Sequence, residues 1–140
     1  MYNPIVIGVD PGLVHTGIVM LEFELELRQL TIDHRVVDGL DAAAAFDAVK
    51  AMTGKDKFAT LDMFIEKYTP RSGFQQDERM VQANETFRST LGGKLLRNTG
   101  VTKVVTTELM QLLHIWSFGT TTHHQDLRSA GRIAVLGMMQ

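Results

Sequence analysis

Cysteine is absent from the sequence of 140 residues. Its absence excludes a disulfide framework, a zinc site built on cysteine and a thiol nucleophile, and it fits a reducing cytosol. The sequence also has no run of about 18 apolar residues, the length that a transmembrane helix needs. The apolar stretch 1–9 is short and has no basic flank, so no signal peptide is predicted. We therefore expect a cytoplasmic protein without a membrane partner.

The length is that of one ordinary domain, and nothing in the sequence divides it. The composition is 44% apolar and 21% charged, which is typical of soluble globular proteins. There is no internal repeat, no low-complexity tract and no long linker. We expect a single domain over 1–140 that buries about two-thirds of the surface its unfolded chain exposes.

The charge is unevenly distributed along the chain. Residues 1–66 carry 5 Lys and Arg against 11 Asp and Glu, whereas 67–103 carry 7 against 3 and 104–140 carry 2 of each. A basic segment in an acidic protein is a candidate polyanion-binding surface. Charge alone favours the alternative, an ordinary solvated face, because amphipathic helices carry Lys and Arg outward.

The apolar patterning predicts a mixed sheet flanked by helices. Ile5–Val9 ends in Asp10-Pro11-Gly12, which is typical of a buried strand closed by a tight turn. Further strands are expected at 17–26, 30–37, 61–65 and 101–106, the last because it is rich in β-branched residues. Helices are expected at 41–52, 75–97, 108–116 and from 123 or 125 to 139, with Gly92-Gly93 weakening the second. Three antiparallel strands followed by parallel βα units make a five-stranded α/β fold.

Three carboxylates lie where a sheet protein gathers its ligands. Asp10 and Glu66 each end a predicted strand, and Asp126 lies in the first turn of the last predicted helix. If the two strands are parallel neighbours, these carboxylates meet at one sheet edge, and such an oxygen-rich cluster selects Mg²⁺ or Mn²⁺. Two ions would suit in-line phosphodiester hydrolysis. Taken singly, each residue has an ordinary explanation as a turn former, a first exposed residue or a helix-start acid.

Two glycines follow Asp10 closely. A residue without Cβ lets the backbone turn sharply or approach a phosphate, and we assign that role to Gly12 and Gly17. Their spacing matches that of a nucleotide-binding P-loop. The Lys-Ser or Lys-Thr pair that completes a P-loop is missing, so no nucleotide cofactor is expected.

Three segments resemble one nuclease family. Ile7-Gly8-Val9-Asp10-Pro11-Gly12, continuing to Thr16-Gly17, is similar to the first motif of RuvC-type Holliday junction resolvases, which are RNase H-like nucleases. Phe64-Ile65-Glu66-Lys67 resembles the second acidic motif of that family, and the stretch from His123 to Val135 resembles its acidic last helix. The segments occur in the order and at the spacings of the family and cover nearly the whole chain. The small size would suit a phage-type member acting in a host cytoplasm.

The resemblance implies an RNase H-like sheet and a nuclease that uses two Mg²⁺ or Mn²⁺ ions per active site. As metal ligands and catalytic residues it carries over Asp10, Glu66 and Asp126. The fourth ligand depends on the register of the last helix. If Asp126 is the later ligand of that helix, His123 is the earlier one, three residues away on the same face. If Asp126 is the earlier ligand, Ser129 takes the later position and a ligand is lost; His124 is a further candidate.

The resemblance also makes the basic segment a surface for the arms of a DNA junction. Its candidate DNA contacts are Lys67, Arg71, Arg79, Lys94, Arg97 and Lys103. Tyr68 lies near the position where the family inserts an aromatic side chain into the junction, and the alternative is a loop aromatic packed on the surface. The family acts as a twofold homodimer, and the candidate interface is the helix predicted at 75–91, unless that helix only packs on the sheet.

The leading hypothesis is a metal-dependent, structure-selective DNA endonuclease that resolves four-way junctions or other branched DNA, as a crossover junction endodeoxyribonuclease in recombination and repair. One alternative is an RNase H-like nuclease acting on RNA or an RNA–DNA hybrid. Another is a nucleotide-binding protein of the actin and sugar-kinase type, although those proteins normally need two such domains. The last is a catalytically inactive junction-binding module, which the position of Ser129 keeps open.

Overall fold

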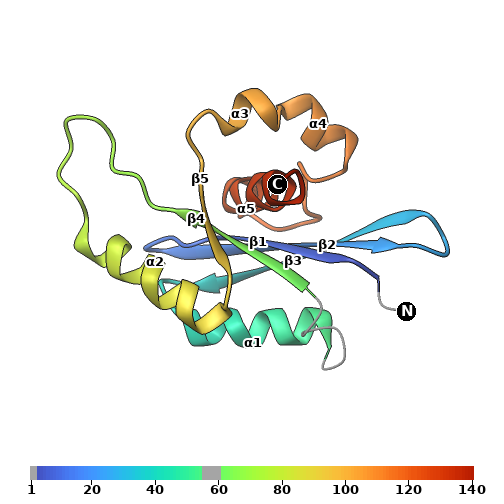
Figure 1. The fold of residues 1–140 in the computed structure, drawn as a ribbon, viewed down its shortest axis with the longest axis horizontal. Coiled ribbons are helices and arrows are strands. Elements are labelled where there is room, and N and C mark those ends of the chain that lie inside the picture. The colour runs from blue at the N-terminus through green and yellow to red at the C-terminus, as the bar shows by residue number, and fades with distance from the viewer. Residues whose placement is uncertain (1–2, 55–60) are drawn as a thin grey trace.

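A five-stranded sheet forms the centre of the molecule (Figure 1). The computed structural model describes residues 3–54 and 61–140. The strands are β1 Ile5–Asp10, β2 His15–Glu24, β3 Gln29–Asp38, β4 Leu61–Lys67 and β5 Lys94–Arg97. They lie in the order β3-β2-β1-β4-β5, with β1 to β3 antiparallel and with β4 and β5 parallel to β1. This mixed sheet confirms the predicted fold class.

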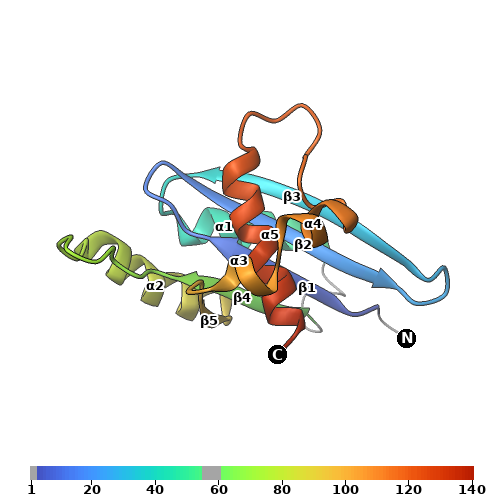
Figure 2. The same cartoon turned by 90° about the horizontal axis from the view of Figure 1, so that it is seen from above.

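Helices cover both faces of the sheet. Helices α1 Ala42–Thr53 and α2 Glu78–Leu91 lie against one face (Figure 1). Helix α5 His124–Met138 crosses the other face, and the short helices α3 Val101–Val104 and α4 Thr107–Leu112 lie beyond it (Figures 1 and 2). Among the described residues, no helix combines the length and the apolar character needed to span a bilayer.

The strands divide their apolar side chains between two cores because successive side chains of a strand point to opposite faces. In β1, Ile5, Ile7 and Val9 join the core against α1 and α2, whereas Val6 joins the core beneath α5. In α2, Phe87 and Leu91 are buried against the sheet. Two side chains of the helix predicted to form the dimer interface are therefore packed inside the protomer and are not free to contact a partner.

Polar caps set the bounds of α1 and α2. The Asp41 side chain accepts a hydrogen bond from the Ala44 N–H at 3.0 Å, and Gly54 caps the other end of α1. The start of α2 is capped by Asp77, and Gly92, with a left-handed φ of 71°, ends it. The predicted helix at 41–52 is confirmed. The helix predicted at 75–97 is wrong beyond residue 91, because the glycine cap stops it and Lys94–Arg97 forms β5.

The strand predicted at 101–106 is wrong. Residues Val101–Val104 form the short helix α3, which follows Gly100 in a left-handed conformation. The edge of the sheet is already taken by β5. The side chains of Val101 and Val105, four residues apart, both join the apolar cluster around α5. That spacing is helical, and here it outweighs the β-branched composition.

Two glycines let α5 lie directly on the sheet. A Cβ built on Gly8 would stand 2.0 Å from the carbonyl oxygen of Ala130 and 2.5 Å from the amide nitrogen of Ala134. A Cβ on Gly17 would stand 2.6 Å from the carbonyl oxygen of Asp126. No side chain fits at either contact. The main chain of α5 therefore rests on β1 and β2 at the place where these strands carry glycine.

We expect Gly8→Ala to destabilise the fold by about 3 kcal/mol, because the new methyl group must push α5 off β1. Chemical denaturation of both proteins measures the difference. Gly100→Ala is the matched control: its φ of 71° makes alanine unfavourable, but no atom lies within 4 Å of the new Cβ. This control should lose only about 1 kcal/mol. Equal losses in the two variants would contradict the close approach of α5.

Candidate active site

The register of β1 against β4 brings two carboxyl groups together. The last aligned pair of these parallel strands is Val9 opposite Ile65, and both side chains join the core against α1 and α2. The next residues, Asp10 and Glu66, therefore lie side by side at the carboxyl ends of the strands and face α5. Their carboxyl groups lie close enough for Glu66 to raise the pKa of Asp10.

Helix α5 adds a third carboxylate and a hydroxyl. The Ser129 hydroxyl lowers the pKa of Asp10, whereas the negative charge of Asp126 raises it, so both side chains act on this carboxyl group. The backbone of Asp126 lies directly on Gly17, so this glycine gives space to the helix. The structure thus places all three predicted carboxylates within electrostatic reach of one another, with Ser129, the substitute in one of the two registers, acting on Asp10.

Burial and like charges hold Asp10 in its protonated form. Loss of solvation contributes most, followed by the hydrogen bond to Glu66 and the negative charges of Glu66 and Asp126; the hydrogen bond from Ser129 opposes them. Together they raise the pKa of Asp10 from 3.8 to about 9. A carboxyl group perturbed in this way by specific neighbours is typical of a functional site.

Two asparagines that the sequence analysis did not single out hold Glu66. Asn98 donates from Nδ2 to Oε1 of Glu66. The buried Asn84 of α2 donates from Nδ2 to the carbonyl oxygen of Glu66 at 3.1 Å and accepts a hydrogen bond from the Tyr68 N–H at 2.6 Å. Asn84 is a polar residue among the buried positions of α2, a signal visible in the sequence. Asn98 follows β5, so it was hidden by the misplaced fifth strand.

The histidines at the start of α5 differ in what they contact. Nδ1 of His123 lies 3.7 Å from Oδ2 of Asp126, and its ring packs edge-on against His15 with 4.2 Å between centroids. His124 instead accepts a hydrogen bond at Nδ1 from the Phe118 N–H at 3.2 Å. Of the two, only His123 therefore lies against the candidate site.

The turn between β1 and β2 is closed by groups of the first motif. A Cβ on Gly12 would stand 2.2 Å from the carbonyl oxygen of His15, so this turn requires glycine. The Gly12 N–H donates to the hydroxyl of Thr16 at 3.3 Å, and that hydroxyl donates to the carbonyl oxygen of Gly39 at 2.7 Å. These contacts fix the chain immediately after Asp10.

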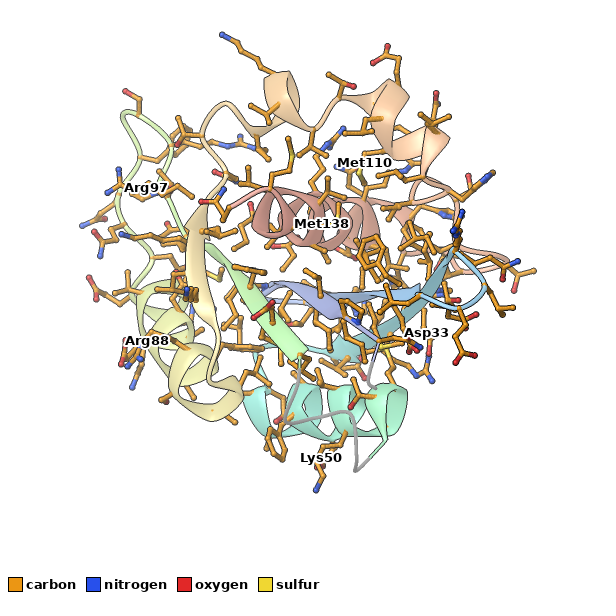
Figure 3. All side chains as sticks on the ribbon, turned by 45° about the vertical axis from the view of Figure 1, so that its right-hand side comes forward. Asp33, Lys50, Arg88, Arg97, Met110 and Met138 are labelled. Carbon is orange, nitrogen blue, oxygen red and sulfur yellow. The ribbon has the colours of Figure 1, made fainter. Side chains whose placement is uncertain are left out.

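The predicted DNA contacts do not form one surface. Lys67 and Arg97 are opposite each other in β4 and β5, at the strand ends next to Glu66. Lys94 begins β5 opposite Phe64, away from Glu66. Arg71 and Lys103 are exposed. Figure 3 shows the side chain of Arg97 projecting beside β5.

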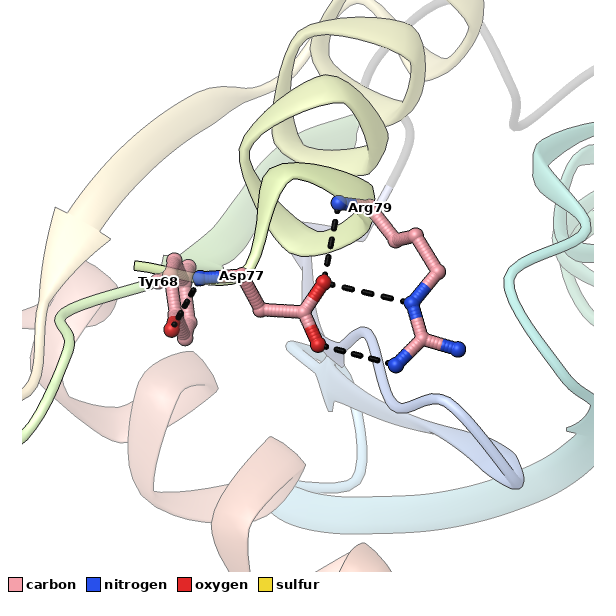
Figure 4. Close-up of polar contacts among 3 residues, drawn as sticks. All are labelled: Tyr68, Asp77 and Arg79. Atoms are coloured by element: carbon pink, nitrogen blue, oxygen red, sulfur yellow. Dashed lines mark hydrogen bonds and ion pairs between the residues drawn. The ribbon is translucent and has the colours of Figure 1, made fainter. Parts of the chain in front are cut away.

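Arg79 and Tyr68 are both tied to the start of α2 (Figure 4). The guanidinium of Arg79 forms an ion pair with Asp77, with 3.0 Å between Nη2 and Oδ2. The hydroxyl of Tyr68 accepts a hydrogen bond from the Asp77 N–H at 3.0 Å. In the same loop, Phe74 is 72% exposed. Sequence reasoning missed Phe74, the aromatic side chain that this loop leaves open to solvent.

The donors around Asp10 are all oxygens, the ligand type that Mg²⁺ and Mn²⁺ prefer. Over residues 3–54 and 61–140, no three His, Asp or Glu side chains are arranged to hold one ion. The raised pKa of Asp10 reflects the repulsion within this cluster. By their chemistry the residues fit a divalent cation, whose positive charge would offset the repulsion among the carboxylates.

Solved structures match nearly the whole chain. Thermus thermophilus RuvC in complex with a Holliday junction substrate is 17% identical, with a TM-score of 0.56 over 94% of this chain and 90% of that one. A second structure of Thermus thermophilus RuvC is 16% identical, with a TM-score of 0.53 over 96% of each chain. The resolvase of fowlpox virus is 9% identical, with a TM-score of 0.49 over 96% of this chain and 98% of that one.

No family model matches the sequence, and neither does any curated protein. The likeness to the RuvC structures, together with the sheet order, shows that the chain has the RNase H-like fold.

Without metal, we expect the free energy of unfolding to fall as the pH rises from about 4 to about 9. The folded protein keeps the Asp10 proton up to its raised pKa of about 9, whereas the unfolded chain loses it near 3.8. The folded state thus binds more protons across this range, and each pH unit lowers stability by up to about 1.4 kcal/mol.

Urea denaturation at several pH values in EDTA measures this slope. Asp10→Asn should flatten it and stabilise the protein most at pH 8. The exposed Asp47 of α1, replaced by Asn, is the control and should leave the slope unchanged. The same slope in wild type and Asp10→Asn would contradict the raised pKa.

Proposed function

We propose that the protein is a metal-dependent, structure-selective endonuclease that hydrolyses phosphodiester bonds in four-way junctions or other branched DNA. The observation that carries the proposal is the cluster of Asp10, Glu66 and Asp126 at the carboxyl ends of β1 and β4 under α5. The RNase H-like fold supports it, since a structure with this fold contains a Holliday junction substrate. The chain would act as one domain over 1–140.

Asp10, Glu66 and Asp126 are the proposed ligands of two Mg²⁺ or Mn²⁺ ions. When bound, such ions activate a water molecule and stabilise the leaving oxygen in phosphodiester hydrolysis. His123, whose Nδ1 lies 3.7 Å from Asp126, either completes the ligand set or orients water and protonates the leaving group. Two hydrogen bonds hold Glu66 in place: Asn98 donates to its side-chain carboxylate and Asn84 donates to its backbone carbonyl oxygen.

The proposed DNA surface lies along the strand ends next to Glu66. Lys67 and Arg97 contribute positive charge there, and Arg71 and Lys103 are further exposed cations elsewhere on the surface. Contacts of this kind to phosphates make binding salt-dependent and largely independent of sequence. Phe74 is the aromatic side chain free to stack on unpaired bases, because it is 72% exposed whereas Tyr68 is hydrogen-bonded at its hydroxyl.

A homodimer follows from the proposed reaction, because paired incisions at a four-way junction need two active sites in one assembly. Phe87 and Leu91 of α2 face the sheet, so the interface would use other residues of this helix. One candidate is Val81, which is 37% exposed and borders, with Tyr68 and Leu95 of β5, a pocket of about 350 Å³.

Incubation with a labelled four-way junction and Mg²⁺ or Mn²⁺ tests the activity. We expect paired incisions near the branch point and none in EDTA or on linear duplex. Asp10→Asn and Glu66→Gln should lower the cleavage rate more than about 100-fold, since each removes a ligand whose ion stabilises the transition state, while junction binding survives. Lys50→Gln, on α1 across the sheet, is the control and should cleave normally (Figure 3).

An RNA–DNA hybrid tested in parallel decides the substrate class. Faster cleavage of the hybrid than of the junction would contradict the proposed specificity but keep the proposed chemistry. Binding without cleavage in either metal would contradict the enzyme.

One observation favours a second candidate function, a catalytically inactive junction-binding module. The hydroxyl of Ser129 faces Asp10, at a position where a carboxylate would bind a cation more strongly. Ser129→Asp adds that carboxylate, and Ser129→Asn is its neutral control. For an enzyme, we expect wild type to cleave and Ser129→Asp to need about tenfold less Mg²⁺, because a charged ligand strengthens metal binding.

A titration of cleavage against Mg²⁺ concentration gives the answer. If Ser129→Asp cleaves junctions and wild type does not, the protein is a binding module that lacks one ligand.

A further inference from the structure

Beside the candidate active site lies a polar pocket that has a positively charged side chain, that of Arg132, in its lining. It has a volume of about 230 Å³, and its lining includes Glu66, Asn98, Thr102, Ser129 and Arg132. Arg132 follows Ser129 by three residues in α5, so both side chains lie on the same face of the helix. The pocket is thus bordered by Glu66 of the carboxylate cluster and by the guanidinium of Arg132.

Arg132 is held in place by neighbours that do not neutralise its charge. Nη2 donates to the hydroxyl of Thr107 at 3.3 Å, and the guanidinium carbon lies 5.6 Å from the centre of the Trp116 ring. Its Nε is buried and has no hydrogen-bond partner among the described residues. A buried N–H group without an acceptor is unfavourable, so the side chain of Arg132 gains if a bound acceptor reaches its guanidinium.

The chemistry of the lining selects a phosphate group. A guanidinium group can donate two parallel hydrogen bonds to the oxygens of one phosphate. The amide of Asn98 and the hydroxyls of Thr102 and Ser129 provide further neutral polar groups in the lining. Glu66 opposes an anion in the pocket. Its carboxylate, however, already accepts a hydrogen bond from the Asn98 amide, which offsets part of that repulsion.

We propose that this pocket binds a phosphate group of the DNA strand next to the bond to be cut, with Arg132 as the binding cation. The inference rests on the proposed nuclease function and deepens it. The carboxylate cluster alone repels a phosphodiester, and a fixed cation at its border gives the strand a place to dock. Arg132 would then position the adjacent bond at Asp10 and Glu66.

Junction binding measured in EDTA tests the pocket apart from catalysis. The logarithm of the affinity is plotted against the logarithm of the salt concentration for wild type, Arg132→Gln and Lys50→Gln. Arg132→Gln should make the slope shallower by about 0.9, because one phosphate contact is lost. Lys50→Gln, which removes the same charge on the opposite side of the sheet, should leave the slope unchanged. Thermal denaturation checks that each variant is folded.

Arg132→Lys is the second variant, because it keeps the charge but not the paired donors of the guanidinium. We expect it to retain the salt slope and bind the junction several-fold more weakly than wild type. A wild-type slope in Arg132→Gln would overturn the proposal.

Inorganic phosphate distinguishes a DNA site from a site for the free ion. Its effect on the NMR signal of the Arg132 Nε–H group is followed in EDTA in wild type and Glu66→Gln. We expect weak binding of phosphate that becomes tighter in Glu66→Gln, because one opposing charge is removed. Phosphate binding together with an unchanged salt slope in Arg132→Gln would show a free-phosphate site and contradict the DNA assignment.

The outcomes also separate this inference from the proposed nuclease activity. A slope that depends on Arg132 in a protein that never cleaves would support the pocket and contradict the enzyme. Cleavage lost in Asp10→Asn but unchanged in kcat and KM in Arg132→Gln would support the enzyme and overturn the pocket.

Discussion

The contact of the α5 backbone with the sheet at Gly8 and Gly17 is the constraint on which the candidate site depends. The Ala130 carbonyl and the Ala134 amide lie where a Cβ of residue 8 would be, and the Asp126 carbonyl lies over residue 17. At this separation the helix has one position along the strands. Its residues 126, 129 and 132, spaced by three, then all lie along the carboxyl ends of β1 and β4. The packing of the α5 backbone on β1 and β2, more than any polar contact, therefore positions the side chains of the candidate site.

The same packing makes the site electrostatically unfavourable when nothing is bound. Three carboxyl groups lie close together and Asp10 is largely withdrawn from water, so the fold keeps a proton that an exposed aspartate would lose. A structure optimised only for stability would replace this cluster with apolar side chains. Its retention beside the cationic pocket of Arg132 is what a site that binds both cations and phosphate requires.

Much of the fold follows from local patterns in the sequence, and the misses have a common origin. The first four strands, the caps of α1 and the approach of Asp10 to Glu66 follow from apolar runs and turn residues. The fifth strand does not, because the β-branched residues at 101–106 favour a strand more strongly than Lys94–Arg97 does. Which segment pairs with β4 depends on the folded sheet and not on local sequence. That error hid Asn98. The pairing of Arg79 with Asp77 and the direction of Ser129 toward Asp10 likewise depend on the folded backbone.

The alternation of side chains between the two faces of β1 also fixes the register in which β1 pairs with β4. Val9 and Ile65 point into one core and Asp10 and Glu66 toward the other face, so a shift of β1 by a single residue would exchange the two sets. Asp10 would then enter the apolar layer against α1 and α2, and a bulky side chain would replace Gly8 beneath α5. An insertion or deletion in this strand therefore abolishes folding and chemistry together. A chain that folds at all has its carboxylates in the correct place.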